Sequence, residues 1–422
     1  YAVLQENGLG VSDVTPFAQM SEAAGGMLTG DSILFVDGFD RALKIPDKGY
    51  PGMSLQKTES EKAIRGSNEG FGDSIKQNTA LIRKRLRSVD LKVAECKCGR
   101  RTATNVDIMY LDGIVRPEIV TQMQQRLAAF EIDGIGDSGV IEQLTETQWF
   151  SPFPQYQTTR RPDRAVMALL EGRSVLLADN SPEALIFPTD YNSFIKTTDD
   201  YYTRWEIATF TRTLRYVAAF LSMILPGLYL AMTNFHTQLL PTKLLLSFAA
   251  ARQGVPFPGV VEVLLMELSF ELLREAGVRL PGAMGNTIGI VGGLIIGQAA
   301  VDANIVSPMV VIVVAFTALC SFAIPNEDFA TAFRLLKFVF IGLSAALGFY
   351  GFLIGLLILL IHLAQLESFG MPYLMPFVGA DLNDYRDERD SLVRPPLQAL
   401  THRPFYANPK NRVRLRMKYK NR

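Results

Sequence analysis

Residues 214–232 have the sequence LRYVAAFLSMILPGLYLAM, a stretch of 19 residues with one charge, Arg215, near its start. This length and composition match a helix of about 20 residues that crosses a lipid bilayer. Pro226 lies inside the stretch and predicts a kink, because proline removes a backbone donor and crowds the preceding turn. The stretch therefore separates a membrane half of the chain from the part that precedes it.

The overall composition hides this division. The 422 residues include 42 Lys+Arg, 42 Asp+Glu and three Cys, and 48% are hydrophobic, as in an ordinary soluble protein. Charged residues are nevertheless sparse from 216 to 365 and dense elsewhere. The zero net charge argues against nucleic acid as a partner, and so few cysteines exclude a disulfide scaffold. The chain begins at Tyr1 without a signal peptide, so we expect the true N-terminus to be missing.

The first 205 residues alternate between short strand and helix patterns. The apolar runs 32–36 and 106–111 each end at an Asp-Gly turn, as strands do. Residues 116–130 have apolar positions at helical spacing, with Pro117 in the first turn, where its missing N–H costs little. Strand, turn and helix in this order predict a soluble domain of the α/β (α+β) class.

A hairpin and a further helix belong to the same domain. The β-prone runs 174–178 and 184–187 flank a short polar turn, in which we expect Asn180 to adopt a positive φ. Residues 71–87 have the apolar stripe of a helix and end in four basic residues between 83 and 87. This cluster is either a contact for anionic lipid or an acidic partner, or a solvated face that complements the helix dipole.

Further apolar segments predict an all-α polytopic membrane domain. The runs 286–306, 309–324 and 339–364 add to 214–232, so we expect about four spanning helices. Residues 242–251 are too short to span, and a Gly/Pro breaker follows them. The stretch 259–275 carries five charges that cannot face lipid, so we interpret 242–275 as a re-entrant or interfacial helix pair. The polar candidates at this membrane interface are Glu262, Glu267, Glu271 and Arg274.

Charge at the two ends predicts the topology. Residues 403–422 hold eight Lys or Arg and no acidic residue, so the positive-inside rule places this tail in the cytoplasm. Arg212 just before the first span and Arg215 at its start place the soluble half on the same side. Both ends inside require an even number of crossings, which four spans satisfy.

The span 286–306 has two different faces. Glycine recurs every fourth residue on one face, which allows a second helix backbone to approach closely. These helix-packing positions are Gly285, Gly289, Gly293 and Gly297. At about 100° per residue, a second set of residues, which includes an amide and a carboxylate, falls on roughly the opposite face. Its members, the pore-lining candidates, are Thr287, Val291, Gln298 and Asp302. They form either a water-facing stripe on a cation path or polar groups that satisfy a neighbouring helix or the headgroups.

The sequence carries no pattern typical of an enzyme. Cys96 and Cys98 are a lone pair without a partner motif, and neither a nucleotide-binding loop nor a nucleophile elbow occurs. We therefore predict no catalytic residue, no cofactor and no metal site. The remaining interpretations are a channel or transporter subunit and a membrane-anchored scaffold that presents the soluble part to partners.

Strings throughout the chain, in one order, resemble the A subunits of spore germinant receptors (GerA type) of endospore-forming bacteria. The strings are EGF at 69–71, NTALIR at 78–83, GRRT at 99–102, RPDR at 161–164, LEGR at 170–173, GVPFP at 254–258, LME at 265–267, LREAG at 273–277 and GQAAV at 297–301. Asn180 and Asp302 depart from the family, which more often has Gly and Glu there.

The resemblance implies a place and a set of partners. It implies an integral protein of the spore inner membrane that acts with a transporter-like B subunit and a lipoprotein C subunit. It also implies a homo-oligomer, a pentameric ring, that forms a germinant-gated ion channel and releases monovalent cations during germination. A paralogous stage V sporulation channel subunit, which aids dipicolinate release, shares this architecture, and an assembly scaffold for the transporter-like partner is a further alternative.

The resemblance and the charge pattern together predict four parts. Residues 1–55 are expected to be the remnant of a first α/β subdomain and 56–205 a second one. Residues 206–375 are the predicted transmembrane domain, and 376–422 are the predicted basic cytoplasmic tail.

Overall fold

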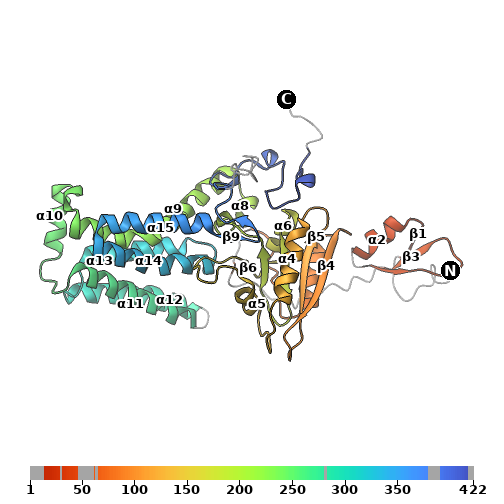
Figure 1. Ribbon diagram of the computed structural model, residues 1–422, viewed down its shortest axis with the longest axis horizontal. Coiled ribbons are helices and arrows are strands. Elements are labelled where there is room, and N and C mark those ends of the chain that lie inside the picture. The colour runs from red at the N-terminus through yellow and green to blue at the C-terminus, as the bar shows by residue number, and fades with distance from the viewer. Residues whose placement is uncertain are drawn as a thin grey trace.

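The computed structural model describes residues 14–28, 31–45, 61, 65–279, 283–378 and 390–416, except for the side chains of 283–291 and 294. Three parts follow one another along the long axis of the molecule (Figure 1). A small N-terminal sheet lies at one end, an α/β domain lies in the middle, and an elongated bundle of helices forms the other end.

The described residues of the N-terminal part form a three-stranded antiparallel sheet and the helix α2. Its strands, in the order β1-β3-β2, are β1 (Thr15–Phe17), β3 (Ala42–Ile45) and β2 (Ser32–Leu34), and its helix is α2 (Met20–Leu28). Lys44 bonds the buried carboxylate of Asp31 at 2.8 Å. The strand predicted at 32–36 is confirmed as β2, and within the 1–55 segment residues 1–13, 29–30 and 46–55 lie outside the described residues.

The central sheet has five strands in the order β4-β5-β7-β8-β6, and every neighbouring pair is antiparallel. The strands are β4 (Leu91–Cys98), β5 (Thr104–Leu111), β6 (Gln157–Thr159), β7 (Ser174–Ala178) and β8 (Ala184–Phe187). The predicted hairpin is confirmed as β7 and β8, and Asn180 in its turn has a φ of +65°. The side chains of β7 and β8 are all buried, because helices cover both faces of the sheet.

Two helices lie on each face of this sheet. Helices α3 (Ile75–Arg85) and α6 (Pro162–Leu170) pack on one face, and α4 (Pro117–Ala128) and α5 (Ser138–Thr145) pack on the other. Pro117 is the first residue of α4, as its sequence position predicts. The short helices α7 (Tyr191–Ile195) and α8 (Asp199–Tyr202) then lead into the bundle.

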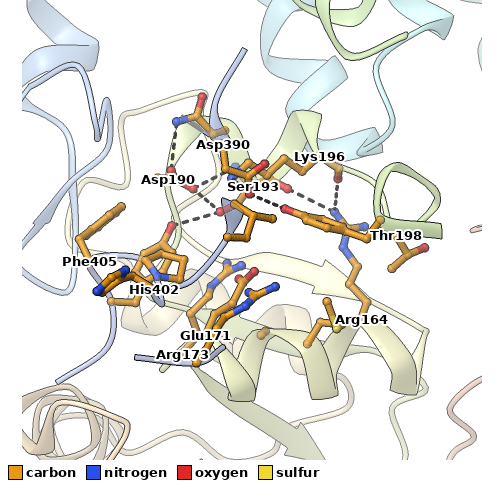
Figure 2. A pocket seen from close by; sticks show the side chains of 18 of the residues that line it. Arg164, Glu171, Arg173, Asp190, Ser193, Lys196, Thr198, Asp390, His402 and Phe405 are labelled. Atoms are coloured by element: carbon orange, nitrogen blue, oxygen red, sulfur yellow. Dashed lines mark hydrogen bonds and ion pairs between the residues drawn. The ribbon is translucent and has the colours of Figure 1, made fainter. Parts of the chain in front are cut away.

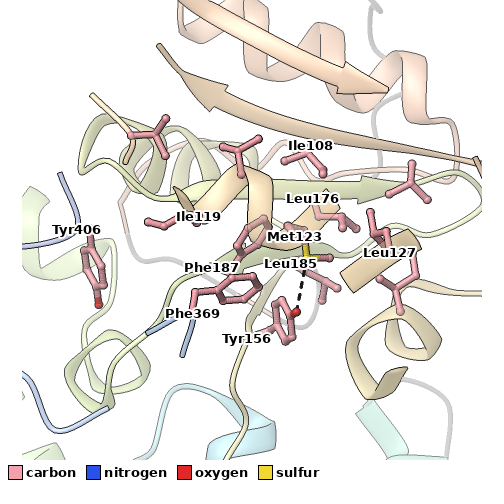
Figure 3. Close-up of a cluster of buried hydrophobic side chains, with 14 of the residues drawn as sticks. Ile108, Ile119, Met123, Leu127, Tyr156, Leu176, Leu185, Phe187, Phe369 and Tyr406 are labelled. Carbon is pink, nitrogen blue, oxygen red and sulfur yellow. Dashed lines mark hydrogen bonds between the residues drawn. The ribbon is translucent and has the colours of Figure 1, made fainter. Parts of the chain in front are cut away.

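Residues from the C-terminal end of the chain complete the core on the α4 side (Figure 3). The hairpin of β9 (Glu367–Ser368) and β10 (Met371–Pro372) carries Phe369 into this core. The ring of Phe369 stacks on Phe187 with centroids 4.7 Å apart and meets Tyr156 edge-on at 5.6 Å. The α/β domain is therefore built from chain segments that precede the helical bundle and from segments that follow it.

The segment 390–416, which the sequence analysis assigns to a tail, packs onto the same domain. It contains the 3₁₀ turns η5 (Leu397–Ala399) and η6 (Pro409–Asn411), and its Phe405 and Tyr406 are buried in the core. The amide of Asn408 donates to the carbonyl oxygen of Ile114 at 2.7 Å. Basic residues lie on both sides of these apolar anchors in the sequence, so a basic composition alone did not reveal the docking.

Long helices form the bundle. They are α9 (Trp205–Leu230), α11 (Gly259–Arg279), α12 (Ala283–Asp302), α13 (Pro308–Phe322), α14 (Glu327–Leu347) and α15 (Phe349–Gln365). The short elements η1 (Ala231–Phe235), η2 (Thr237–Leu239) and α10 (Thr242–Ala251) follow α9, and α10 lies at the end far from the α/β domain (Figure 1). Two helical stretches, 205–235 and 327–347, are long and apolar enough to cross a membrane. Pro226 lies inside α9.

The prediction of a single span over 339–364 is wrong. Helix α14 ends at Leu347, and α15 begins at Phe349 and packs back against α14. Gly348 makes the reversal with a φ of +62°, a conformation that favours glycine. A Cβ at Gly351 would collide with the backbone oxygen of Leu343, so glycine also allows the close approach of the two helices. Hydropathy did not reveal the turn, because the residues around it remain apolar.

The predicted re-entrant pair is also corrected. Only α10 is short, whereas α11 runs along the bundle beside α12 and α13. Glu262 near the start of α11 contacts Ser307 at the beginning of α13, and Arg274 near its end contacts Ser321 at the end of α13. The charges of α11 suggested an interfacial helix, but the bundle pairs them internally. The described helices thus leave the α/β domain and return to it. This path is compatible with the expectation that both ends of the chain lie on one side of the membrane.

Phe369 tests the closure of the domain core. Phe369→Ala is expected to lower the free energy of unfolding of the α/β domain by about 3–5 kcal/mol, because it leaves a cavity beside Phe187 and Tyr156. Chemical denaturation of the full chain in detergent, followed by circular dichroism, measures the loss. Phe377→Ala is the matched control, because that ring is 54% exposed. Equal losses in both variants would contradict the closed core.

Candidate functional site

The outer face of α12 presents two polar side chains of the predicted pore-lining set. Gln298 and Asp302 are both exposed, one helical turn apart, and the amide of Gln298 donates to a carboxylate oxygen of Asp302 at 3.1 Å. They therefore lie on one face, as their spacing predicts. No side chain of another described helix bonds to this pair, so the carboxylate faces outward from the bundle.

The glycines of α12 contact its neighbours. A Cβ at Gly293 would lie 3.6 Å from Phe270 of α11, and a Cβ at Gly297 would lie 3.3 Å from Val311 of α13. At Gly292 a Cβ would come within 2.7 Å of the end of the Leu273 side chain, so a side chain at this position would require Leu273 to move. Described glycines thus pack inward while Gln298 and Asp302 point outward.

Four further predicted residues lie at the start of α12. The backbone of Gly285, Thr287, Gly289 and Val291 is helical, but their side chains lie outside the described residues. Their roles in packing or in lining a pore remain predictions.

Charged side chains of α11 and α14 pair inside the bundle. Lys337 of α14 bonds Glu267 at 2.5 Å and Glu271 at 3.3 Å, and both Lys337 and Glu267 are buried. Arg334 also bonds Glu271, and Arg274 approaches Glu327 at the start of α14 at 3.5 Å. A buried charge needs such a partner, because an isolated ion in an apolar interior costs several kcal/mol. These pairs fix how α11 lies against α14.

Glu262 connects three elements at the far end of the bundle. Its side chain is completely buried and accepts a hydrogen bond from the backbone amide of Ser307, the residue before α13, at 2.8 Å. Arg252, in the loop after α10, bonds the other carboxylate oxygen at 3.2 Å. The carboxylate therefore stabilises the start of α13, as an anion does at a helix N-terminus, and holds the α10–α11 loop.

A second charged cluster joins α9 to the α/β domain. Arg212 is completely buried and bonds Asp200 of α8 at 3.3 Å and Asp390 of the C-terminal segment at 2.8 Å. Arg215 bonds Asp200 at 2.8 Å. Burial alone would raise the pKa of Asp200, but the hydrogen bond from Arg215 and the charges of both arginines lower it below the ordinary value. The three segments are therefore held together while both carboxylates are ionised.

Acidic side chains gather where α5 faces the start of α14. Thr158 donates to a carboxylate oxygen of Asp328 at 2.9 Å, across the junction between domain and bundle. Burial, and then the charge of Asp328, raises the pKa of Glu142 in α5 to about 8. Glu146, Glu183 and Asp137 raise it further. This junction is therefore sensitive to protonation near neutral pH.

The sequence analysis missed the roles of both junctions. It interpreted Arg212 and Arg215 as topology signals, whereas they are ligands of Asp200, which lies 12 and 15 residues earlier in the chain. In the predicted basic cluster, Lys84 and Arg85 pair with Glu69 and are not free for an acidic partner. No described group of three or more His, Cys, Asp and Glu side chains is arranged to hold a metal ion.

The exterior of the bundle is apolar. On α15 alone the exposed residues include Leu353, Ile354, Leu357, Ile358, Leu360 and Ile361. A water-soluble surface rarely carries so large a continuous apolar area. The fold and the site thus define a class of protein in which a lipid-compatible helical bundle, with its charges paired inside, is fastened at one end to a polar α/β domain.

Comparison with known proteins assigns the family within this class. The family model described as Bacillus/Clostridium GerA spore germination protein matches residues 2–406, and the chain belongs to that family. Spore germination protein KA of Bacillus subtilis (strain 168) is 42% identical over 92% of this chain and 71% of its own length. Spore germination protein GerLA of Bacillus cereus is 38% identical over 97% of this chain and 82% of its own length.

Two further similarities complete the comparison. A Bacillus subtilis protein named uncharacterized membrane protein YfkQ is 41% identical over 94% of this chain and 77% of its own length. The crystal structure of the N-terminal domain of the A subunit of the Bacillus megaterium spore germinant receptor GerK3 matches at 28% identity. That match covers 42% of this chain and 62% of the other and has a TM-score of 0.31, too low to support conclusions about the fold. The relatives named for germination are not named as enzymes.

Lys337 tests the pairing inside the bundle. Lys337→Met is expected to destabilise the chain by about 3–5 kcal/mol, because it leaves the buried Glu267 without its cation. Thermal unfolding in detergent measures the effect. Adding Glu267→Met to the first variant should recover much of the stability, and Lys243→Met, at an exposed position of α10, should have little effect. A double variant as unstable as the single one would show that the pair is not the cause.

Glu142 tests the protonation of the α5–α14 junction. Because its folded pKa is raised to about 8, the folded state holds a proton between about pH 4.5 and 8 that the unfolded state has released. Stability should therefore fall as pH rises through this window, and Glu142→Gln should flatten the fall. Melting temperatures from pH 5 to 9 measure it, with Glu118→Gln at an exposed position of α4 as the control. Parallel pH profiles for the wild type and Glu142→Gln would contradict the raised pKa.

Proposed function

We propose that this chain is the A subunit of a nutrient germinant receptor in the spore inner membrane. In this proposal it assembles into a germinant-gated ion channel that releases monovalent cations and triggers spore germination. Membership of the GerA family and the germination relatives from two Bacillus species support a role in germination. The apolar exterior of the bundle and its two long apolar helices support a location in a membrane.

The observation that carries the channel part is the outward carboxylate of α12. Asp302, bonded only to Gln298 among the described residues, is exposed on a bundle whose other outward side chains are largely apolar. A charge at that position needs water, an ion or a polar neighbour, because lipid cannot satisfy it. In a ring of subunits, α12 from each copy would turn this face toward a central path, and repeated carboxylates would attract monovalent cations.

The fold also supports an arrangement of partners and sides. The α/β domain and the C-terminal segment lie at the same end of the bundle, so both would face the cytoplasmic side, the spore core. A transporter-like B subunit and a lipoprotein C subunit would bind alongside, and the oligomer would be a pentamer. A nutrient signal from the B subunit would reach α9 through the Arg212 cluster and change the tilt of α12 against α11. No catalytic step is part of this mechanism.

A membrane-anchored scaffold for a transporter-like partner is the second candidate function. The observation in its favour is the internal pairing of the α11 and α14 charges, which leaves these groups unavailable to a passing ion. In that case α12 would bind the partner through Gln298 and Asp302. The stage V paralogue is the less favoured alternative, because the relatives reported above are named for germination.

Substitution of the outward pair separates channel from scaffold. The double variant Gln298→Ala, Asp302→Ala in purified complexes reconstituted into liposomes is expected to reduce potassium flux at least tenfold with assembly unchanged. Flux assays and native mass spectrometry measure the two properties. The matched control is Gln124→Ala, Asp133→Ala, the same changes at exposed positions of the α/β domain. Normal flux and selectivity in a correctly assembled double variant would refute the conduction role.

A further inference from the structure

A cavity of about 460 Å³ lies between the α/β domain and the C-terminal segment (Figure 2). The end of α6 and the start of β7 form one wall, the α7–α8 region forms another, and residues 399–406 with Arg414 close it. This volume is in the range of cavities that bind small molecules. The cavity lies away from α12 and from the paired charges of α11 and α14.

Most charged groups around this cavity already have partners. Asp390 bonds Lys196 at 3.4 Å and is also held by Arg212. Asp190 caps α7, where it accepts the backbone amide of Ser193 at 2.9 Å. Figure 2 shows these bonded groups on the side of the cavity opposite Glu171 and Arg173. They are part of the framework and have little capacity left for a ligand.

Arg173 is different, because it is buried and only partly bonded. Its side chain is 4% exposed, and its Nε donates to the carbonyl oxygen of Pro188 at 2.8 Å. Its guanidinium lies over the ring of Tyr406 at 5.1 Å. One terminal nitrogen, Nη2, is buried and has no hydrogen-bond partner among the described residues. A buried donor without an acceptor costs about 1–3 kcal/mol. An acceptor from a bound molecule would remove this cost at Nη2.

Two other charged lining residues also lack a side-chain bond among the described residues. Arg414 and Glu171 line the cavity, and their backbone amides are bonded, but neither side chain makes a hydrogen bond or ion pair there. Burial raises the pKa of Glu171, more than the charges of Lys196, Arg173 and Arg414 lower it. A carboxyl group with a raised pKa carries less negative charge than an ordinary carboxylate, so Glu171 neutralises less of the positive charge of Arg173 and Arg414. The cavity therefore has an excess of positive charge.

We propose that this cavity binds a small organic anion whose carboxylate or phosphate group is held between Arg173 and Arg414. Guanidinium groups bind both kinds of oxyanion through paired N–H donors. Glu171 would hydrogen-bond a second polar group of the same molecule. Because Arg173 belongs to the α/β domain and Arg414 to the C-terminal segment, the bound anion fastens that segment onto the domain. This proposal does not depend on the ion path.

Thermal unfolding of the full chain in detergent tests the proposal with three probes. The probes are inorganic phosphate, succinate and dihexanoyl phosphatidic acid, each compared with chloride at equal ionic strength. Saturable stabilisation by at least one probe is expected. Stabilisation by phosphate or succinate would assign a free anion, and stabilisation by the lipid alone would assign a headgroup. No saturable effect from any probe up to 10 mM would overturn the proposal.

Arg414→Gln identifies the site, with Arg416→Gln as its matched control on the same segment. Both substitutions remove one positive charge, but Arg416 does not line the cavity. Arg414→Gln is expected to raise the half-saturating concentration of the probe at least tenfold, and Arg416→Gln is expected to leave it unchanged. Equal behaviour of the two variants would overturn the proposal.

Hydrogen exchange of the wild-type chain provides a measurement that needs no variant. The bound probe should slow amide exchange in residues 399–406, because the anion fastens this segment to the domain. Binding without added protection there would place the anion elsewhere and would also overturn the proposal.

Discussion

The stacking of Phe369 on Phe187 joins two segments of the chain, one before and one after the helical bundle, into one α/β domain. The chain leaves this domain at α9 and returns at β9, and Arg126 lies 4.0 Å from the centre of the Phe369 ring on the domain side. Aromatic contacts of this kind bury a large area in a fixed geometry. The first and last helices of the bundle are therefore tied to one body, so a change in the domain reaches the bundle at two places.

Paired charges set the positions of the helices between these two attachments. Lys337 with Glu267 holds α14 to α11, and Arg212 with Asp200 and Asp390 holds α9 to the domain. Such pairs add little net stability compared with well-packed apolar residues, but removing one partner is costly. They therefore favour a particular register of the helices. The carboxylate of Asp302 bonds only Gln298 of its own helix among the described residues, which is why the proposed function places the ion path there.

Local signals in the sequence predicted local structure well. The turn at Asn180 and the start of α4 at Pro117 depend on the conformations that one or two residues favour. The reversal at Gly348 escaped prediction because the helices on both sides of it are apolar. Helix α11 was misplaced because its Glu267 and Glu271 have a partner 70 and 66 residues away, Lys337, which no local pattern reveals.

The sequence by itself determined the α/β class of the first part of the chain, the helical nature of the second part and the shared face of Gln298 and Asp302, because these depend on neighbouring residues and on helical or strand periodicity. Only the tertiary structure decided that α11 belongs to the bundle and that Phe369, Phe405 and Tyr406 complete the domain core. It alone brought Arg173 and Arg414 to one cavity, from positions 241 residues apart in the chain. The physical reason is that burial and charge pairing satisfy each group with whatever the fold brings near, regardless of distance along the chain.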